Sequence, residues 1–568
     1  MHETSIRALV GALIGAVAVA ACGGSAPVGS PAQPLAPLGA QVLRFGVAQP
    51  ALNLDPARTH DPTTVSLVQN LFDGLYRWDE HLRIVPDAAL GMPDVSPDGL
   101  TYTFHLNPAV RFSNGDPVTA QDWIWSWTRA LRIHAADLSA LELIQGAAEV
   151  EQGRASTVTG LSAPGDLTLV ARLVRPAGYW LGQLAIPGPA SVVDPRVLTA
   201  SGDPDGSAWA TSPATCVGTG PYRLAGVRPG RSLWFTPLAD WWGGSSGVLQ
   251  KVVVDLGVAP STQVRRFEDG AYDLVGEASQ PIDPADLVRY AEQPNLRQQL
   301  HQEPTATTVA LAFDPESGPF AGGTEPAAVS AGTTPAPAED RGPIAREAFD
   351  LAIDRQQLAN AACAGSLTCV PATGGPIPPT LRGYLGTGKD PYAHADPARA
   401  RRLLAEAGGP ARFDGLVLAY PPDDRSARVA HELVAQWRSA LGVEVTAAAV
   451  APGAVQARPV LFLETWTAPY DSPQAWFDAH PSCTAVPLAG IGSACPASVT
   501  RLVGRAAVTA GDGALPLYQQ ALQVVVRDVT WAALLYGQQP VLIQPYLLGW
   551  DYSGLEDVPW TDLKFIAR

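Results

Sequence analysis

The sequence has little charge and very little lysine. Charged residues make up 16% of the 568 residues, and the lysines are limited to Lys251, Lys389 and Lys564. Lys and Arg together number 38 against 54 Asp and Glu, which gives a formal net charge of −16. An acidic chain repels the phosphate backbone, so we do not expect nucleic acid as a partner. Low charge together with 46% hydrophobic residues is typical of a folded, core-forming protein.

The sequence also lacks the short motifs that mark common active sites. It contains no Gly-x-Ser-x-Gly elbow, phosphate-binding loop, dinucleotide fingerprint or His-Glu-x-x-His motif. No His or Cys residues stand at the spacing of a zinc site, and segment 203–206 has only two acids of a calcium loop. We therefore expect no enzymatic activity, no cofactor and no metal. A secreted hydrolase stays a distant alternative.

Long hydrophobic runs are missing except near the N-terminus. The run from Ala8 to Ala21 would span about 21 Å as a helix, short of the ~30 Å hydrocarbon core, and it follows Arg7. This pattern predicts a signal peptide over residues 1–21. The run ends in Val-Ala-Ala-Cys, which resembles a bacterial lipoprotein box and implies lipidation of Cys22. An ordinary secretory signal that happens to contain a cysteine is the alternative. Residues 22–41 are then the lipidated Cys and a flexible linker.

Five further cysteines follow in the part of the chain that is expected to lie outside the cytoplasm, where disulfides persist. Cys363 and Cys369 form one close pair, Cys483 and Cys495 form another, and Cys216 is left over. Each close pair could close a local loop, but the connectivity cannot be deduced from the sequence.

Strand and helix patterns alternate along the chain and predict an α/β fold. Residues 101–106 alternate like a half-buried strand, and residues 121–132 have the apolar spacing of an amphipathic helix. Its three tryptophans are expected to pack in a core. The clearest unit is a strand at 416–420, a helix at 425–441 and a strand at 443–450, which together predict a βαβ crossover. At this length we expect three or four domains or a few large lobes.

Seven segments resemble one family when they are taken in order. They are Asn70–Tyr76, Leu100–Leu106, Val110–Trp123, Gly218–Tyr222, Gly270–Leu274, Ala345–Arg355 and Trp466–Pro473. The set resembles the large extracellular solute-binding proteins of ABC importers, family 5, whose best-known members bind oligopeptides and dipeptides. The resemblance covers residues 42–568. Each segment also has an architectural interpretation, such as turn formation or helix capping.

The resemblance implies a two-lobed clamp of the periplasmic-binding-protein type (class II, the large peptide-binding type), with mixed sheets and a two-segment hinge. Lobe I is expected to hold residues 42–304 plus 538–568, and lobe II residues 305–537, with 315–343 as a mobile loop. Ligand would bind between the lobes and favour the closed form. The closed form would be recognised by an ABC permease, and separate ATPase subunits would hydrolyse ATP.

The resemblance also implies a ligand site that departs from the peptide-binding pattern. We expect the cleft to be lined by Trp466, Tyr470 and Asp471, with Gln49 from the opposite lobe. In peptide binders an Asp that pairs with the ligand's α-ammonium usually stands where this chain has Pro469. Asp471 could replace it, because it lies on the same face of an extended segment. The alternative is that Asp471 only forms a turn and Trp466 belongs to the core.

Taken together, these features predict a monomeric, lipid-anchored protein at the extracytoplasmic face of the cell membrane. It would capture peptides or a related small solute and deliver them to an ABC importer permease. The alternative is a binding module of the same fold that serves non-peptide solute uptake or cell-envelope sensing.

Overall fold

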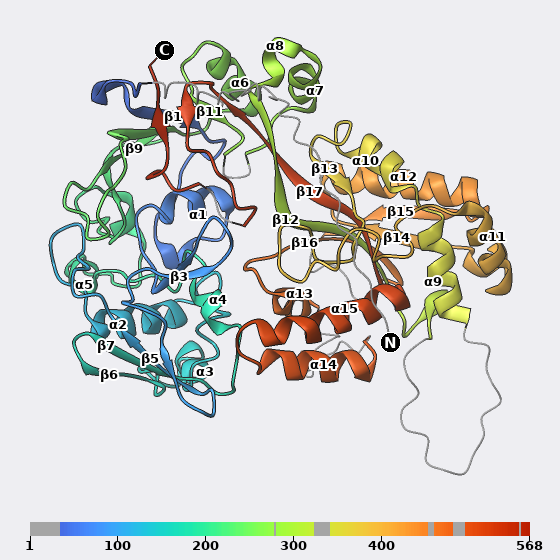
Figure 1. Ribbon diagram of the computed structural model, residues 1–568, viewed down its shortest axis with the longest axis horizontal. Coiled ribbons are helices and arrows are strands. Elements are labelled where there is room, and N and C mark those ends of the chain that lie inside the picture. The colour runs from blue at the N-terminus through green and yellow to red at the C-terminus, as the bar shows by residue number, and fades with distance from the viewer. Residues whose placement is uncertain are drawn as a thin grey trace, which may run out of the picture.

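Two groups of sheets are joined by two long strands in the computed structural model (Figure 1). The structure describes residues 34–277, 280–322, 341–451, 459–480, 495–555 and 558–567. The predicted signal peptide, residues 1–21, and the predicted lipidation site, Cys22, lie outside these residues. Within the described residues, no helix is both long and apolar enough to cross a membrane. Below, lobe I denotes residues 42–304 and 538–567, and lobe II denotes residues 305–537, the division predicted from the sequence.

Lobe I contains a first sheet in the order β1-β10-β9-β8. Its strands are β1 (Val42–Gly46), β8 (Tyr222–Arg228), β9 (Ser232–Pro237) and β10 (Lys251–Asp255). β1 is parallel to β10, and the other pairs are antiparallel. Val252 and Val254 alternate with half-buried neighbours, so one face of β10 enters the core.

The second sheet of lobe I has the order β4-β5-β7-β6 and is covered by α2 (Ala120–Arg132). Its strands are β4 (Asp94–Val95), β5 (Thr101–His105), β6 (Leu161–Gly165) and β7 (Thr168–Arg172). α2 begins with a capping box in which Thr119 and Asp122 satisfy each other's backbone amides. Trp123 and Trp127 are fully buried and Trp125 is half-buried against a core cluster, which confirms the predicted packing of the three tryptophans.

Short elements complete lobe I. The strands are β2 (Tyr76–Trp78), β3 (Ile84–Pro86), β11 (Leu274–Val275), β18 (Leu547–Leu548) and β19 (Lys564–Phe565). The helices are α1 (Pro62–Val68), α3 (Ala147–Glu151), α4 (Trp180–Leu184), α5 (Pro195–Ala200), α6 (Pro260–Glu268), α7 (Pro284–Glu292) and α8 (Pro294–Arg297). Asp61, Asp194 and Asp283 cap α1, α5 and α7 ahead of a proline in the first turn.

Lobe II is built on a large mixed sheet in the order β11-β17-β12-β16-β14-β15, with β13 paired to β17. Its strands are β12 (Leu300–Phe313), β13 (Cys369–Pro371), β14 (Leu416–Tyr420), β15 (Val445–Ala449), β16 (Leu461–Thr467) and β17 (Trp531–Ile543). Its helices are α9 (Arg341–Leu351), α10 (Arg355–Ala362), α11 (Pro397–Glu406), α12 (Asp424–Leu441), α13 (Pro473–Ala479), α14 (Ala497–Ala507) and α15 (Leu515–Asp528).

The predicted βαβ unit is confirmed. β14 and β15 are parallel, and α12 crosses between them. α12 ends at Gly442, whose φ of 69° places it in the left-handed region that favours glycine. Val429, Leu433 and Trp437 on one face of α12 are fully buried in the core of lobe II.

Strands β12 and β17 connect the two lobes. They are antiparallel along their length, and Pro304 lies opposite Gln538, so the two predicted crossing points face each other across one ladder. The register shifts between Pro304 and Thr308. One end of the pair packs beside α6 and α7, and the other end enters the core beneath α9–α12.

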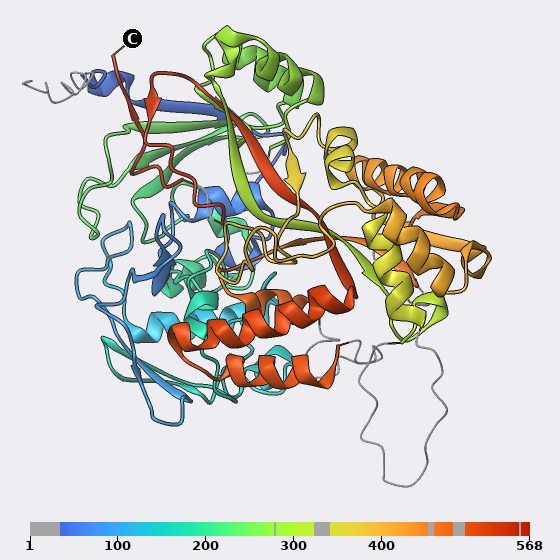
Figure 2. The ribbon, with the colours of Figure 1, turned by 45° about the vertical axis from the view of Figure 1, so that its right-hand side comes forward.

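A hydrophobic cluster extends across the lobe boundary. It begins around the second sheet of lobe I and continues through α13, α14 and α15 of lobe II. Both ribbon views show α14 and α15 beside lobe I (Figures 1 and 2). The amide of Gly178 donates to the carbonyl of Ala507 over 2.8 Å, which ties lobe I to the end of α14.

Two segments expected to be irregular are partly ordered. The end of the predicted linker 22–41 docks on the fold, because Ala36 and Pro34 exchange backbone hydrogen bonds with the C-terminal strand and Gln41 is buried. Of the predicted loop 315–343, Gly318–Phe320 form a 3-10 helix with Phe320 fully buried, and α9 begins at Arg341. Residues 323–340 lie outside the described residues.

The cysteines agree with a mainly local pattern of bridges. Cys363 and Cys369 form a disulfide between the end of α10 and β13. Cys495 is disulfide-bonded, and Cys483, its expected partner, lies outside the described residues. Cys216 is buried and free, and its burial raises the pKa of its thiol to about 12.

Candidate functional site

The end of β16 combines an exposed backbone edge with aromatic side chains. The backbone amide of Ala468 donates to the carbonyl of Ala306 in β12. Along a strand, the N–H and C=O groups of successive residues point to opposite sides. The backbone groups of Thr465 and Thr467 therefore point away from β12. β14 pairs with β16 at one position, near the start of β16. Thr465 and Thr467 are exposed, and none of the described strands pairs with this part of the edge.

Trp466 lies on the buried side of this strand. It faces Thr308 of β12 and is 6% exposed within the cluster that crosses the lobe boundary. The structure therefore places Trp466 in a packed wall at the end of β16, where its ring supports the exposed edge.

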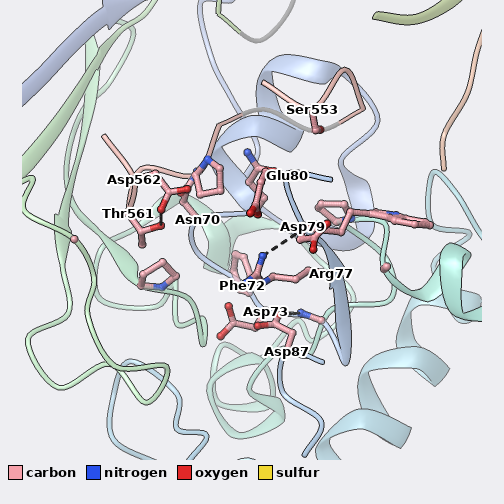
Figure 3. Close-up of a pocket in the computed structure, with 18 of the residues that line it drawn as sticks. Asn70, Phe72, Asp73, Arg77, Asp79, Glu80, Asp87, Ser553, Thr561 and Asp562 are labelled. Atoms are coloured by element: carbon pink, nitrogen blue, oxygen red, sulfur yellow. Dashed lines mark hydrogen bonds between the residues drawn. The ribbon is translucent and has the colours of Figure 1, made fainter. Parts of the chain in front are cut away.

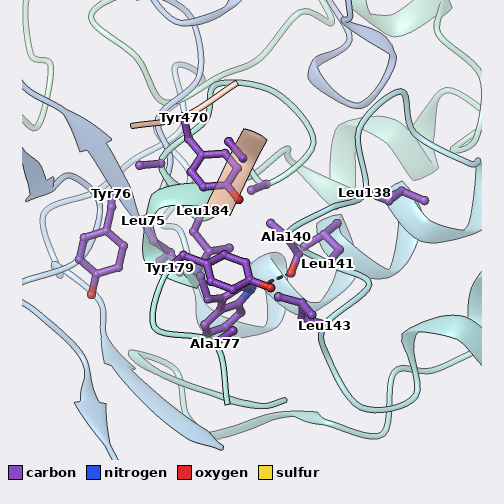
Figure 4. Packing of buried hydrophobic residues seen from close by; sticks show 14 of the residues in the cluster. Leu75, Tyr76, Leu138, Ala140, Leu141, Leu143, Ala177, Tyr179, Leu184 and Tyr470 are labelled. Carbon is purple, nitrogen blue, oxygen red and sulfur yellow. Dashed lines mark hydrogen bonds between the residues drawn. The ribbon is translucent and has the colours of Figure 1, made fainter. Parts of the chain in front are cut away.

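Tyr470 contacts lobe I directly. Its ring stacks on Tyr179 with centroids 6.4 Å apart, and it lies against Gly182 of α4. Its hydroxyl donates to Asp478 over 3.2 Å, and burial raises the pKa of Asp478. Figure 4 shows Tyr470 and Tyr179 side by side within the hydrophobic cluster. Tyr470 is 2% exposed, so in this conformation it is an interlobe contact.

Asp471 is paired within the chain. Its side chain is fully buried and accepts hydrogen bonds from the backbone amide of Arg382 over 2.6 Å and from Nε of Arg382 over 2.9 Å. Burial raises the pKa of Asp471, while Arg382 opposes that shift. In this structure the cationic partner of Asp471 is Arg382. The ligand-pairing role predicted for Asp471 stays a prediction.

Gln49 lies in lobe I, after β1. Its side-chain amide donates to Thr63 over 2.9 Å, and its carbonyl oxygen accepts from Gln280 over 3.3 Å. Gln280 also donates to Thr63 and accepts from the amide of Ala48. Gln49 therefore belongs to a polar network inside lobe I, and its side-chain hydrogen bonds to Thr63 and Gln280 do not reach the segment of Trp466, Tyr470 and Asp471. Its predicted place in the cleft stays a prediction.

The sequence analysis did not identify Tyr179, which stacks on Tyr470, or Arg382, which pairs with Asp471. Tyr179 also accepts a hydrogen bond from Arg175, and a Cβ at Gly178 would collide with the carbonyl of Thr509. The Gly-Tyr-Trp-Leu-Gly stretch at 178–182 is the signal that could have indicated a close aromatic contact. No pattern in the sequence around Arg382 indicates its pairing with Asp471, because a single arginine in a turn is common.

The described residues offer no evident metal centre. Among them, no group of three or more His, Cys, Asp or Glu side chains is placed to hold a metal ion.

Comparison with known proteins places the chain among binding proteins. A family model described as "Bacterial extracellular solute-binding proteins, family 5 Middle" matches residues 83–487. The oligopeptide-binding protein OppA of Bacillus subtilis is 24% identical over 72% of this chain and 70% of its own length. A probable deoxycholate-binding periplasmic protein of Escherichia coli, YgiS, is 25% identical over 94% of each chain.

Solved structures show the same fold. The unliganded open form of the periplasmic murein tripeptide-binding protein MppA superposes with a TM-score of 0.78 at 22% identity, covering 94% of this chain and 99% of that one. The clavulanic acid biosynthesis oligopeptide-binding protein 2 gives a TM-score of 0.76 at 19% identity, covering 93% and 95%. The predicted α/β clamp, with its mixed sheets, is therefore confirmed.

Proposed function

Because the chain belongs to the bacterial extracellular solute-binding proteins of family 5, we propose that it captures peptides and delivers them to the permease of an ABC importer. Relatives named as oligopeptide-binding proteins support the ligand class. A ligand held between lobes I and II would contact both lobes only when they close, so binding would favour the closed form.

The exposed edge of β16 is the observation that carries the peptide proposal. A peptide in extended conformation can add to an open strand edge, and its backbone then forms the hydrogen bonds that a neighbouring strand would form. Thr465 and Thr467 present such groups beside Trp466. Backbone pairing of this kind is independent of ligand sequence, which suits a protein that takes many peptides.

A non-peptide solute is the second candidate, and two observations favour it. Pro469 stands where peptide binders have the Asp that pairs with an α-ammonium, and Asp471 is already paired with Arg382. A relative over nearly the full length is named as a probable deoxycholate-binding protein. A ligand without a free α-ammonium would fit such a cleft, and the same edge of β16 could still bind its amide or hydroxyl groups.

We further propose that Cys22 carries the lipid anchor and that the protein works as a monomer at the extracytoplasmic face of the cell membrane. The Val-Ala-Ala-Cys sequence supports lipidation. One acyl chain binds a membrane only marginally, whereas two or more hold a protein stably, so a multiply acylated Cys22 would tether the fold.

A proline substitution tests the peptide proposal at the β16 edge. Thr465→Pro removes an amide that points away from β12, so the β12–β16 ladder is retained. With a synthetic tetrapeptide library as probe, binding should weaken between about twofold and tenfold, the range for one neutral hydrogen bond. Thr465→Val keeps the amide and serves as the matched control.

Equal binding by the Thr465→Pro and Thr465→Val variants would refute edge pairing. Failure of the wild-type protein to bind any library member, with binding of bile acids or other apolar solutes instead, would favour the second candidate.

A further inference from the structure

Lobe I contains a pocket of about 790 Å³ that is separate from the edge of β16. It lies between the β2–β3 hairpin, residues 185–191, residues 241–248 and the C-terminal residues 549–553 and 559–564. Figure 3 shows Arg77, Asp79 and Glu80 from the hairpin facing Thr561 and Asp562 from the C-terminal segment. All its lining residues belong to lobe I, so the pocket stays assembled whether the lobes are open or closed.

The pocket lining is strongly acidic. Six carboxylates line it against two basic groups, Arg77 and Lys564. The acids are Asp73, Asp79, Glu80, Asp87, Asp551 and Asp562. Glu80, Asp551 and Asp562 are exposed, whereas Asp73 is buried, so negative charge extends from the mouth of the pocket to its interior. A concave surface with one sign of charge concentrates ligands of the opposite charge.

Asp73 is a buried carboxylate whose side-chain hydrogen-bond partners, Trp242, Thr219 and Trp241, are all neutral. It is 6% exposed, and its Oδ2 accepts a hydrogen bond from the indole Nε1 of Trp242 over 2.9 Å. Arg77 influences it only through space, and no ion pair joins Asp73 to a basic side chain among the described residues. Burial raises the pKa of Asp73 to about 6. A buried charge of this kind is normally paired, so the site suits a cation from outside the chain.

Aromatic side chains complete the walls. Phe72, Tyr76, Trp78 and Trp241 line the same pocket. Aromatic faces attract organic cations and shield their alkyl parts from water.

The shape of the acidic lining favours an extended cation over a metal ion. The described carboxylates do not gather into a group that could hold a metal. Asp79 is engaged by Arg83 over 2.7 Å. Asp87 accepts from the amide of Gly74, the residue after Asp73, so Asp73 and Asp87 lie together, apart from Asp562 (Figure 3). Separate negative charges along a pocket match several ammonium groups spaced along one molecule.

We propose that this pocket of lobe I binds a small organic polycation, with one ammonium group paired to Asp73 and others paired to Asp551 and Asp562 at the mouth. Binding here does not require lobe closure, and it does not depend on the peptide proposal. The pocket would give the protein a second ligand, held within lobe I.

Calorimetric titration with spermidine as the probe tests the assignment on the full chain. We expect one saturable site whose affinity falls as salt is raised. Asp73→Asn should weaken binding at least tenfold, because a buried charged hydrogen bond is lost. The double variant Asp551→Asn/Asp562→Asn, at exposed positions, should weaken it several-fold. Asp166→Asn, an exposed acid of lobe I outside the pocket, is the matched control and should stay within twofold of wild type.

Unchanged affinity in a folded Asp73→Asn variant would overturn the proposal, as would an equal loss in Asp166→Asn, which would indicate non-specific attraction. If Asp73→Asn does not fold, the exposed double variant decides, and unchanged affinity there contradicts the assignment. Binding of a lysine-rich peptide without binding of spermidine would assign the pocket to a basic protein partner and refute the small-solute proposal.

Discussion

Replacing Asp73 with Asn should stabilise the protein at neutral pH. Burial raises the pKa of Asp73 from 3.8 to about 6, so the folded state favours the neutral carboxyl. The protonated carboxyl of Asp73 contributes its full stabilisation of the folded state below about pH 3.8. This contribution is lost as the pH rises through about 6. A rise of this size corresponds to roughly 3 kcal/mol. Asn keeps an oxygen that can accept from Trp242 without carrying a charge.

Urea denaturation at several pH values measures this effect. The Asp73→Asn variant should match wild type near pH 4 and exceed its free energy of unfolding by about 1–3 kcal/mol at pH 7.5. Burial raises the pKa of Asp350 to about 7. Asp350 titrates in both proteins, so its contribution cancels in the difference between their free energies of unfolding. A variant that is less stable than wild type at pH 7.5 would show that the carboxylate has a stabilising cation, and the reasoning about Asp73 would fail.

Three further predictions concern the lobes and the anchor. Asp471→Ala should lower the free energy of unfolding by about 1–3 kcal/mol, because the backbone amide and Nε of Arg382 lose their acceptor; unchanged stability with weaker ligand binding would instead assign Asp471 to the ligand. Tyr470→Ala should destabilise the protein by about 3 kcal/mol and increase the radius of gyration in small-angle scattering, because the contact with Tyr179 is removed; an unchanged radius would contradict a role in holding the lobes. Cys22→Ser should release the protein from the membrane fraction or block its processing, and membrane retention with a cleaved signal would count against lipidation.

Local signals in the sequence were sufficient for much of the fold. The βαβ unit around α12 could be predicted because its apolar stripe and Gly442 both indicate the same helix. α2 could be predicted in the same way from its apolar spacing. The seven family segments indicated the clamp, because their order along the chain is more specific than any one of them.

The contacts between distant segments could not be predicted. Asp471 and Arg382 are 89 residues apart, and nothing in either local sequence indicates the pairing. The stacking of Tyr470 on Tyr179 depends on how the lobes meet, which no local pattern encodes. Residues 34–41 dock through backbone hydrogen bonds to residues 565 and 567 and through the side chain of Gln41, which bonds the backbone of Phe565. These partners are more than 500 residues away in the sequence, so no local pattern indicates them.

The lobe I pocket escaped sequence reasoning for a related reason. Its acids come from segments near residues 73–87 and 551–562, and their spacing matches no metal or catalytic motif. In the sequence they are ordinary surface charges of an acidic protein. Only the fold brings Asp73 into a buried position beside Trp242.

Hydrogen–deuterium exchange of segment 461–468 tests the central claim most directly. The account predicts that a saturating peptide ligand slows exchange at the amides of Thr465 and Thr467, which point to the exposed edge. The amide of Ala468, already bonded to Ala306, should change much less. Unchanged exchange at Thr465 and Thr467 in the presence of a bound peptide would contradict capture at the edge of β16.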